Sequence, residues 1–259
     1  MTETELFFED SNSFVGVVKT YYDIGQFNLK EEYFVNAGKK EGTYKSYHKN
    51  GKLHKEINYM NGLEHGIFKS YYEEGIPSLE VNYVNGLKQG LCKYYCCYGT
   101  LYEENNYVNG IINGISTTYH MNGRTFEEVN YVNGKKNGIC ITYNQNGKIN
   151  EEKKYINDKI IGICRSYHDN GQLCQESKYI DGIINGICVS YHRNGQFKGE
   201  VNYIDGKMNG PHKLYHDNGK LYQEINYVNS KIVGIYKMYH DNGDLLVELD
   251  YGDGELDEE

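Results

Sequence analysis

One stretch of the sequence, residues 131–155, reads YVNGKKNGICITYNQNGKINEEKKY, and its pattern returns along nearly the whole 259-residue chain. Four positions define the pattern: a leading glycine, a middle tyrosine five residues later, a turn glycine four residues after that, and a closing tyrosine eight residues further on. Ten repeats keep all four positions, and from Tyr59 to Tyr251 the closing tyrosine recurs every 24 residues. A fixed period of about 20–50 residues is typical of solenoids, propellers and other arrays. The sequence therefore predicts a tandem repeat protein.

Each repeat contains two short runs with a period of two, separated by turn residues. In the quoted repeat, Ile139 and Ile141 alternate with Cys140, as they would on the two faces of a strand. Asn146 and Gly147 follow, and Asn-Gly is a strong hairpin signal because glycine readily adopts a positive φ. The second run covers residues 148–155. We therefore expect each repeat to fold as a β-hairpin, with a second turn leading to the next one.

The two turns differ in their use of glycine. Glycine fills the first turn of every repeat, whereas Asp158 and Ser230 replace it in the second turn. We expect the first turn to require a left-handed residue and the second to accept Asn, Asp or a looser loop. The structural turn glycines predicted in this way are Gly51, Gly75, Gly99, Gly123, Gly147, Gly171, Gly195, Gly219 and Gly243.

A lone hairpin is marginally stable in water, so each repeat must bury its Ile/Leu/Tyr face and pair its edges with its neighbours. Leucine-rich repeats need a leucine pattern that is absent, and propeller blades need about 40 residues. The expected fold is all-β: a single-layer, elongated antiparallel β-sheet solenoid of about ten 24-residue hairpins. We expect these repeats over residues 13–251, an N-terminal cap or frayed segment over residues 1–12, and an acidic tail over residues 252–259.

Two of the repeats read YVNGKKNGICITYNQNGKINEE and YIDGKMNGPHKLYHDNGKLYQE. This pattern resembles the MORN repeat, in the variant form found in bacterial proteins named as YwqK-like antitoxins and in proteins of large amoebal viruses. The resemblance covers about residues 13–251. It implies a twisted single-layer sheet of hairpins that serves as a scaffold, a dimerisation module or a membrane-associated module. The chain differs from the better-known MORN form in its 24-residue spacing and its lack of tryptophan.

The charge is −9 overall, but it is concentrated at the two ends of the chain. Residues 1–12 and 250–259 hold four and six acids without Lys or Arg, which leaves 36 − 10 = 26 acids against 27 bases in the body. This balance does not favour a nucleic-acid partner, since it lacks a basic stripe, and it offers no polybasic cluster for anionic lipid. Without an apolar run of about 20 residues or a basic leader, we expect a soluble intracellular protein in a reducing compartment. If the protein is viral, as the Asn/Ile/Lys/Tyr-rich composition also suggests by analogy, that compartment is the host cytoplasm or the virion.

A glutamate lies five residues after the turn glycine in nine repeats, on the strand face opposite the closing tyrosine. One interpretation is a hydrogen-bonding ladder that fixes the hairpin register. The alternative is an acidic interaction stripe that faces a cation or a partner. The candidates are Glu56, Glu80, Glu104, Glu128, Glu152, Glu176, Glu200, Glu224 and Glu248.

Cysteine and histidine also recur at fixed positions. Equivalent residues of adjacent hairpins lie about 9.5 Å apart, which is too far for a disulfide or a shared metal ion. We therefore expect seven free cysteines, with Cys92, Cys140, Cys164 and Cys188 as small sheet-face residues. The histidines that follow the middle tyrosine are expected to be solvent-exposed turn residues, and no metal site is expected.

No nucleophile elbow, phosphate-binding loop or H-E-x-x-H motif is found, so we expect no catalytic residues and no cofactor. The favoured function is a non-catalytic repeat scaffold for protein–protein interaction, with an unidentified protein partner and self-association through the terminal edge strands as a further expectation. One alternative is a peripheral membrane or lipid-contact module. The other is a glycan-binding repeat protein, because aromatic rows can hold sugars.

Overall fold

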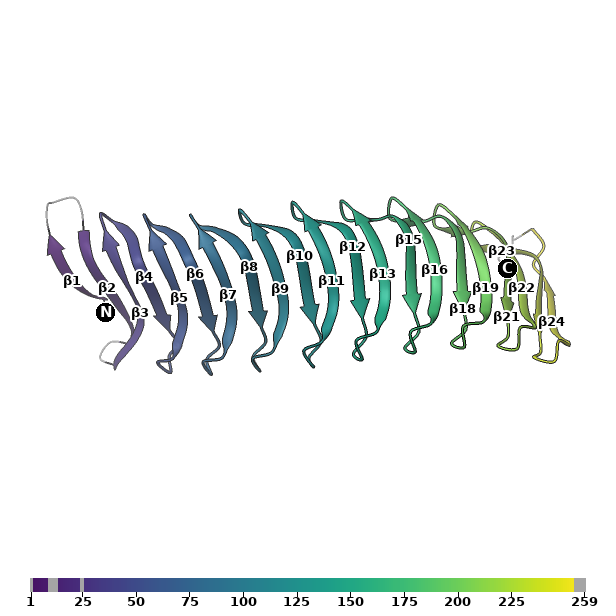
Figure 1. Cartoon of the computed structure of the whole chain (residues 1–259), viewed down its shortest axis with the longest axis horizontal. Helices are drawn as coiled ribbons and strands as arrows, with labels where there is room; N and C mark the ends of the chain where they lie inside the picture. Colours follow the sequence, from purple (N-terminus) through teal and green to yellow (C-terminus); the bar gives the residue numbers. More distant parts are fainter. Residues whose placement is uncertain (1, 9–13, 24–25, 254–259) are drawn as a thin grey trace, which may run out of the picture. The chain divides into compact units, whose positions relative to one another are not determined.

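The computed structural model describes residues 2–8, 14–23 and 26–253, and it places them almost entirely in β-strands and turns (Figure 1). The strands belong to one 24-stranded sheet in which hydrogen-bonded neighbours are antiparallel. The all-β hairpin-repeat class predicted from the sequence is thus confirmed. Residues 9–12 and 254–259, which belong to the expected N-terminal segment and acidic tail, lie outside the described residues.

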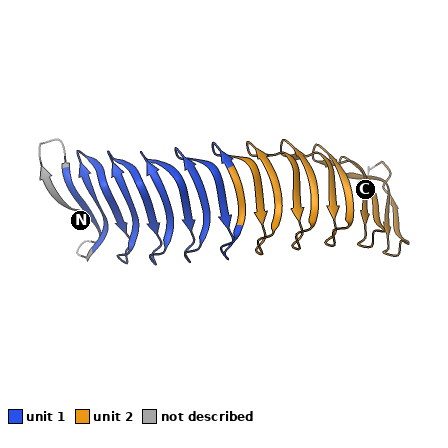
Figure 2. Ribbon diagram, in the orientation of Figure 1, with its two compact units in different colours: residues 1–125, 131–134 blue, residues 126–130, 135–259 orange. Residues whose placement is uncertain are grey.

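The chain divides into two compact units, one of residues 1–125 with 131–134 and one of residues 126–130 with 135–259 (Figure 2). Unit 1 contains β1 (Thr2–Phe8), β2 (Phe14–Asp23), β3 (Gln26–Asn36), β4 (Lys39–Tyr47), β5 (Leu53–Met60), β6 (Leu63–Tyr71), β7 (Pro77–Val84), β8 (Leu87–Tyr95), β9 (Leu101–Val108) and β10 (Ile111–Tyr119). β11 (Thr125–Val132) contributes residues to both units.

Unit 2 contains β12 (Lys135–Tyr143), β13 (Ile149–Ile156), β14 (Lys159–Ile160), β15 (Gly162–Tyr167), β16 (Leu173–Ile180), β17 (Ile183–Ile184), β18 (Gly186–Tyr191), β19 (Phe197–Ile204), β20 (Lys207–Met208), β21 (Gly210–Tyr215), β22 (Leu221–Val228), β23 (Lys231–Tyr239) and β24 (Leu245–Asp250). Three strands have only two residues: β14, β17 and β20. Each is the beginning of a first strand, and a bulge separates it from the rest of that strand, which is β15, β18 or β21. In each unit, a first strand pairs through the first turn with a second strand of the same repeat.

The first turn is a short loop closed by two backbone hydrogen bonds. In the quoted repeat, the amide of Asn144 donates to the carbonyl of Lys148, and the amide of Gly147 donates to the carbonyl of Asn144, both at 2.8 Å. Gly147 has a φ of 83°. The other eight turn glycines also adopt positive φ, between 80° for Gly219 and 96° for Gly243.

The second turn is the tighter of the two, so the expectation of a looser loop there was wrong. Both of its central residues adopt positive φ, as in a type I′ hairpin turn: 49° for Asn157 and 69° for Asp158, and 51° for Asn229 and 68° for Ser230. Where glycine is absent, the side chain makes a compensating contact. Asp158 Oδ1 accepts a hydrogen bond from the amide of Lys136 at 2.7 Å, and Ser230 Oγ accepts one from the amide of Met208 at 3.0 Å.

The leading glycine forms a β-bulge, which the sequence pattern did not reveal. Between β7 and β8 the register passes from Val81↔Cys92 to Asn82↔Gln89, so Gly90 and its neighbour are extra residues on β8. The φ of Gly90 is 77°. On its other side, β8 pairs with β9 without a break at this position, from Gly90↔Tyr107 onward. The glycine therefore allows one strand to keep two different registers.

The buried side of the sheet carries small residues. Cys92, Cys140, Cys164 and Cys188 are buried in the row two residues after the leading glycine, and the equivalent Ser116 is buried as well. The neighbouring row, on the second strands, is also buried and includes Val81, Val129 and Ile225. All seven cysteines are free.

The first-strand isoleucine that we expected on the buried Ile/Leu/Tyr face lies on the opposite face. Ile139 is 63% exposed, whereas Cys140 beside it is buried. Larger side chains also lie on this buried face. The ring of Tyr44, which occupies the same row, lies 5.8 Å from that of Tyr33 and 6.1 Å from that of Tyr59, and the Lys40 ammonium lies 4.4 Å from the ring centres of Tyr33 and Tyr44. Aromatic rings and long side chains thus shield this face of the sheet.

Candidate interaction surface

The glutamate that recurs five residues after the turn glycine lies on the exposed face, and in several repeats it pairs with a cation across the hairpin. In unit 1, Lys93 stands opposite Glu104, and its ammonium lies 3.5 Å from the carboxylate. In unit 2, Arg165 Nε lies 2.8 Å from Glu176. The same pairing joins Lys45 to Glu56, Lys69 to Glu80, Lys213 to Glu224 and Lys237 to Glu248.

The middle tyrosine of the following repeat adds a second contact to the same carboxylate. The Tyr119 hydroxyl donates to Glu104 at 2.7 Å in unit 1, and the Tyr167 hydroxyl donates to Glu152 at 2.8 Å in unit 2. Burial and then the hydrogen bond to Glu152 raise the pKa of Tyr167. Tyr143 donates to Glu128 at 3.2 Å. The glutamates therefore link consecutive hairpins, as in the ladder interpretation.

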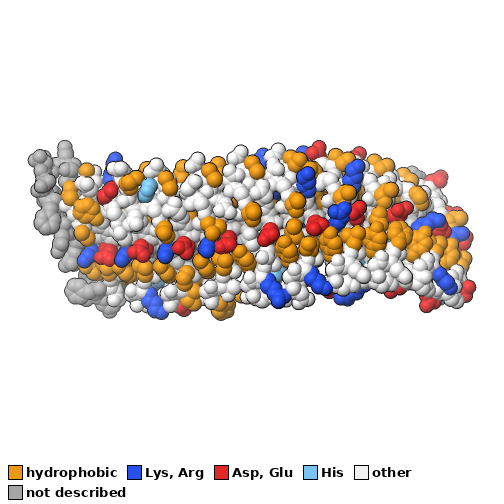
Figure 3. Space-filling view, viewed as in Figure 1, with side chains coloured by type: hydrophobic (Ala, Val, Ile, Leu, Met, Phe, Trp, Pro, Cys, Tyr) orange, Lys and Arg blue, Asp and Glu red, His pale blue; other side chains and the backbone are white. Residues whose placement is uncertain are grey.

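Unit 2 breaks the alternation of charge at two first-strand positions. Ile141 stands opposite Glu152, and Val189 stands between Glu176 and Glu200 in the register. Unit 1 places Lys19, Lys45, Lys69 and Lys93 in this row, but it also has an uncharged residue there, Thr117 opposite Glu104. Figure 3 shows the regular part as a row of alternating acidic and basic side chains.

Exposed apolar side chains accompany this charged row. Ile139 and Ile141 are two residues apart on β12, so Ile139 shares the face of Ile141 and of its partner Glu152. At the position after the leading glycine, the exposed fractions of the isoleucine and leucine side chains run from 44% for Leu91 to 63% for Ile139. We call this set the isoleucine row: Ile67, Leu91 and Ile115 in unit 1, and Ile139, Ile163, Ile187 and Ile235 in unit 2.

A second apolar row runs beside the second turns of the same face. It is formed by the residue that follows the closing tyrosine, which is 40% exposed at Val84 and 52% exposed at Ile204. Val84 stands opposite Leu87, which is also exposed. Hydrophobic side chains are widespread on the face shown in Figure 3. Scattered apolar residues are normal on a surface, but repeated contiguous rows indicate an interaction surface.

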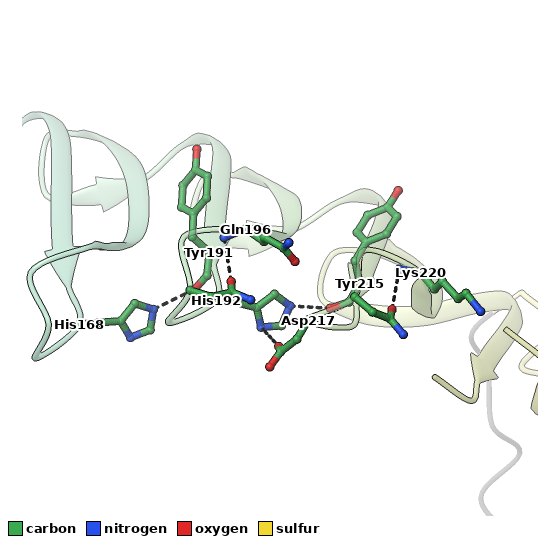
Figure 4. A network of polar contacts seen from close by, with 9 residues as sticks. His168, Tyr191, His192, Gln196, Tyr215, Asp217 and Lys220 are labelled. Atoms are coloured by element: carbon green, nitrogen blue, oxygen red, sulfur yellow. Dashed lines mark hydrogen bonds and ion pairs between the residues drawn. The ribbon is translucent and has the colours of Figure 1, made fainter. Parts of the chain in front are cut away.

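The histidines expected in solvent are instead half-buried links between first turns. His168 Nε2 donates to the carbonyl of Tyr191 at 3.0 Å, and His192 Nε2 donates to the carbonyl of Tyr215 at 2.7 Å (Figure 4). His192 Nδ1 also lies 2.7 Å from Asp217. Of the histidines that follow the middle tyrosine, one is exposed, His240, and the others are half-buried: His48, His120, His168, His192 and His216. The expectation holds for His240 but was wrong for His168 and His192, because their rings reach the next repeat.

Tyrosine takes over this role in some repeats, which the sequence reading missed. The hydroxyl of Tyr72 donates to the carbonyl of Tyr95 at 2.7 Å, and that of Tyr22 donates to the carbonyl of Tyr47 at 2.6 Å. Both tyrosines occupy the position of the histidines, directly after the middle tyrosine. That shared position was the available signal.

Other chemistries find little support in the described residues. No group of three or more His, Cys, Asp or Glu side chains in residues 2–8, 14–23 and 26–253 is placed to hold a metal ion. Burial raises the pKa of the Cys140 thiol to about 11, which opposes thiolate chemistry there. In the same part of the chain, no helix has the length and hydropathy of a membrane span.

Comparison with solved structures gives weak likenesses. A crystal structure of TcdB2-TccC3-Cdc42 matches at 11% identity with a TM-score of 0.15, over 91% of this chain and 17% of that one. A crystal structure of TcdB2-TccC3 matches at 8% identity and the same TM-score, over 94% of this chain and 19% of that one. The chain thus spans less than a fifth of these proteins, and no argument rests on them. No curated protein matches the sequence.

The family model described as the MORN repeat variant matches seven segments of the chain. They are residues 40–61, 64–85, 136–157, 161–181, 184–205, 208–229 and 232–253, which together make up more than half of the sequence. Each segment contains the turn glycine and closing tyrosine whose geometry is described above. The chain belongs to the MORN repeat family, in its variant form.

Proposed function

We propose that this MORN repeat protein is a non-catalytic scaffold that binds a protein partner on the face carrying the isoleucine row. The observation that carries the proposal is the repeated exposure of a large aliphatic side chain at one position, such as Ile115 at 58% and Ile139 at 63%. A partner that covered these side chains would gain roughly 25 cal/mol of binding free energy for each Å² of apolar surface removed from water.

The charges on this face favour a protein partner over a charged polymer or lipid. Glu104 already contacts Lys93 and Tyr119, and Glu176 already contacts Arg165. Because these carboxylates and cations neutralise one another, the face offers no strong field of one sign to attract phosphate groups. It suits an apolar protein surface with a mixed polar rim.

Repetition supplies the affinity in this proposal. Equivalent side chains of adjacent hairpins recur about every 9.5 Å, since each hairpin adds two strand spacings. Within unit 2, Ile139, Ile163 and Ile187 therefore offer the same contact three times. A partner with several apolar contacts would gain avidity from simultaneous engagement, even if each contact is weak.

A threonine variant tests the proposal without disturbing the strands. Thr43 already occupies the isoleucine-row position of its repeat, so Ile139→Thr, Ile163→Thr and Ile187→Thr introduce a residue that this position tolerates. We expect the triple variant to fold normally and to bind a partner purified with the wild-type chain at least 10-fold more weakly. The matched control is Met121→Thr, at a first turn where the side chain is 68% exposed.

Unchanged partner affinity in the triple variant would refute the proposal. The same variants separate the alternatives. Flotation with neutral and anionic vesicles that is lost in the triple variant would indicate a lipid-contact module. Two results together would indicate a glycan-binding protein. The wild-type chain would bind a glycan array, and the triple variant would bind protein partners as well as the wild type does.

A further inference from the structure

A cavity of about 630 Å³ lies among three consecutive first turns of unit 2. These turns join β18 to β19, β21 to β22 and β23 to β24. Part of the wall is formed by the rings of Tyr222 and His216, whose centres lie 4.8 Å apart, and part by Leu214. Cavities of this size, with apolar and aromatic walls and a few polar groups, are typical of ligand sites.

Leu214 gives this cavity an apolar wall at a position that is polar in the two preceding repeats, where Ser166 and Ser190 stand. Leu214 lies in register with Gly199 of the neighbouring strand. A Cβ at Gly199 would lie 2.6 Å from Leu214 Cδ2. The absence of a side chain at Gly199 therefore makes room for the leucine.

One arginine of the chain shows how an aspartate at a first turn pairs with a guanidinium. Arg193 Nη2 lies 3.4 Å from Asp169 Oδ2 of the preceding repeat. Asp217 and Asp241 occupy the equivalent position in the next two repeats, two residues after the middle tyrosine. Asp217 is therefore followed by a second aspartate and not by an arginine, and both aspartates line the cavity.

The two aspartates of the cavity differ in what they contact. Asp217 Oδ1 lies 2.7 Å from His192 Nδ1 (Figure 4). The carboxylate of Asp241 has no hydrogen-bond or ion-pair partner among the described residues. The backbone of Asp241 is nevertheless held, because its carbonyl accepts a 2.8 Å hydrogen bond from the side-chain amide of Asn218. Asp241 thus presents a carboxylate to a ligand from a turn that is tied to its neighbour.

Lys198 lines the cavity from another hairpin and does not neutralise Asp241. It occupies the position of Tyr222 one repeat earlier, and its hairpin lies two repeats before that of Asp241. Two repeats correspond to about 19 Å along the sheet, which is beyond the reach of an ion pair. Lys198 is therefore placed to meet a carbonyl of a bound polypeptide at the other end of the cavity.

We propose that this cavity binds an arginine side chain of a partner polypeptide, with the guanidinium against the Asp241 carboxylate and the Tyr222 ring. A guanidinium fits because it is planar, stacks on aromatic faces and pairs with carboxylates through forked N–H donors. A lysine ammonium is more strongly hydrated and fits less well. The cavity is larger than one side chain, so it also accommodates residues beside the arginine. The isoleucine row is not part of this site, and either proposal can fail alone.

An NMR titration of the full chain tests this proposal. The probe is the tripeptide acetyl-Leu-Arg-Leu-amide, and the ligand control replaces arginine by citrulline, which has the same shape without the charge. We expect saturable shifts of the backbone amides in residues 216–222 and 240–243. The citrulline tripeptide should bind about 10-fold more weakly, because it lacks the charge-assisted contact. The lysine tripeptide and free arginine should also bind more weakly than the arginine tripeptide.

Substitution of the carboxylate provides the first test in the protein. Asp241→Asn should weaken binding of the arginine tripeptide about 10-fold. The position tolerates an uncharged residue, since Gln145 occupies it in another repeat. Asp181→Asn is the matched control: it removes the same charge at a second turn, where Asn61 is the equivalent residue. It should leave the affinity unchanged.

Substitution of the ring provides the second test. Tyr222→Asn, which copies Asn150 at the same position, should weaken binding of the arginine tripeptide. Tyr222→Phe, which copies Phe126, should preserve binding, because the face of the ring and not its hydroxyl makes the contact. The amide spectrum of each variant shows whether the hairpins remain folded.

Four results would overturn the proposal. They are absence of saturable binding, equal affinity for the arginine and citrulline tripeptides, shifts confined to other parts of the chain, and unchanged affinity in a folded Asp241→Asn variant. Tighter binding of free arginine than of the tripeptide would also overturn it, since the site would then take a free amino acid and not a polypeptide.

Discussion

The Tyr167 hydroxyl donates a 2.8 Å hydrogen bond to the Glu152 carboxylate, which belongs to the preceding hairpin. The two residues lie on neighbouring strands, β15 and β13, that pair through Glu152↔Arg165. This contact joins one repeat to the next on the exposed face. It therefore makes the glutamate row part of the coupling between hairpins.

Removing this hydroxyl should weaken the coupling. We expect Tyr167→Phe to lower the free energy of unfolding by about 1 kcal/mol, the typical net contribution of an intramolecular hydrogen bond. Tyr191→Phe is the control, since the structure gives the Tyr191 carbonyl, and not its hydroxyl, a hydrogen bond to His168. Urea unfolding measures both. Equal losses would contradict the assignment.

The same tyrosine should affect stability at alkaline pH. Burial, followed by the hydrogen bond to Glu152, raises the pKa of Tyr167 above its ordinary value of 10.0. A raised pKa means that the folded state holds the proton more tightly than the unfolded state does. The contribution of Tyr167 to the free energy of unfolding is therefore fully present below pH 10 and is lost as the pH rises through the pKa of the folded state. Absorbance titration of the folded chain should show one late-titrating tyrosine fewer in Tyr167→Phe.

Substitution by valine should cost a similar amount of stability at two turn positions that differ in sequence, Gly219 and Ser230. Gly219 has a φ of 80°, and a Cβ there would meet no atom within 4 Å, so the cost of Gly219→Val is conformational. We expect a loss of about 1–3 kcal/mol. Ser230→Val should cost as much, because Ser230 has a φ of 68° and its hydroxyl binds the Met208 amide.

Asn and Gly variants provide the controls for these turns. Gly219→Asn should cost less than Gly219→Val, because Asn tolerates the left-handed region. Ser230→Gly should be nearly neutral, since relief of the backbone offsets the lost hydrogen bond. Thermal unfolding ranks the four variants. A harmless Ser230→Val would restore the looser-loop interpretation of the second turn.

The hairpins could be predicted from the sequence because their signals are local. Asn146-Gly147 marks a turn, and the alternation of Ile139, Cys140 and Ile141 marks a strand. Which face is buried could not be predicted in the same way, because it depends on the side chains that cover Cys140 from other strands. The bulge at the leading glycine also went unnoticed, since it changes the register toward one neighbour only.

The candidate site was predicted in part. The nine glutamates were found by their spacing, and the structure supplies partners for several of them, such as a cation of the same hairpin for Glu176 and a tyrosine of the next hairpin for Glu152. The isoleucine row was read as buried, because aliphatic residues in a strand usually face a core. A single sheet has no second layer to cover Ile139, which is why it is exposed.

Stability should fall at acidic pH through His212. Burial lowers the pKa of His212 below 6.5, and its Nδ1 is buried without a hydrogen-bond partner in the described structure. The unfolded chain then binds the proton more tightly, so this contribution is present above about pH 6.5 and is lost as the pH falls. His212→Ser, which copies Ser116 in the same row, should reduce the loss of stability between pH 7 and pH 5.

The exposed His240 provides the comparison for this acid effect. Urea midpoints are measured for His240→Ser and His212→Ser at each pH, and the larger change is expected in His212→Ser. His54, whose pKa is lowered by burial and by the charge of His48, should maintain part of the loss in both variants. An identical pH profile for wild type and His212→Ser would contradict the account of the buried row.

The cysteines should react in two groups. Cys97 is exposed and a backbone hydrogen bond at Tyr98 lowers the pKa of Cys96, so both should react rapidly in the native chain. Cys92 and Cys140 are buried and their pKa values are raised by burial, so both should react slowly. Thiol titration in denaturant without reductant should count seven thiols. A lower count, or rapid native labelling of Cys140, would contradict the buried cysteine row.

Site-specific photo-crosslinking tests the interaction surface most directly. A photoreactive phenylalanine at Ile115, which is 58% exposed on the isoleucine row, is compared with the same group at Met121, which is 68% exposed at a first turn of the same unit. We predict that a discrete protein is cross-linked from position 115, that this product is lost in Ile67→Thr/Leu91→Thr, and that position 121 gives little of it. Equal cross-linking from both positions, or a product from position 115 that survives the threonine substitutions, would contradict the account.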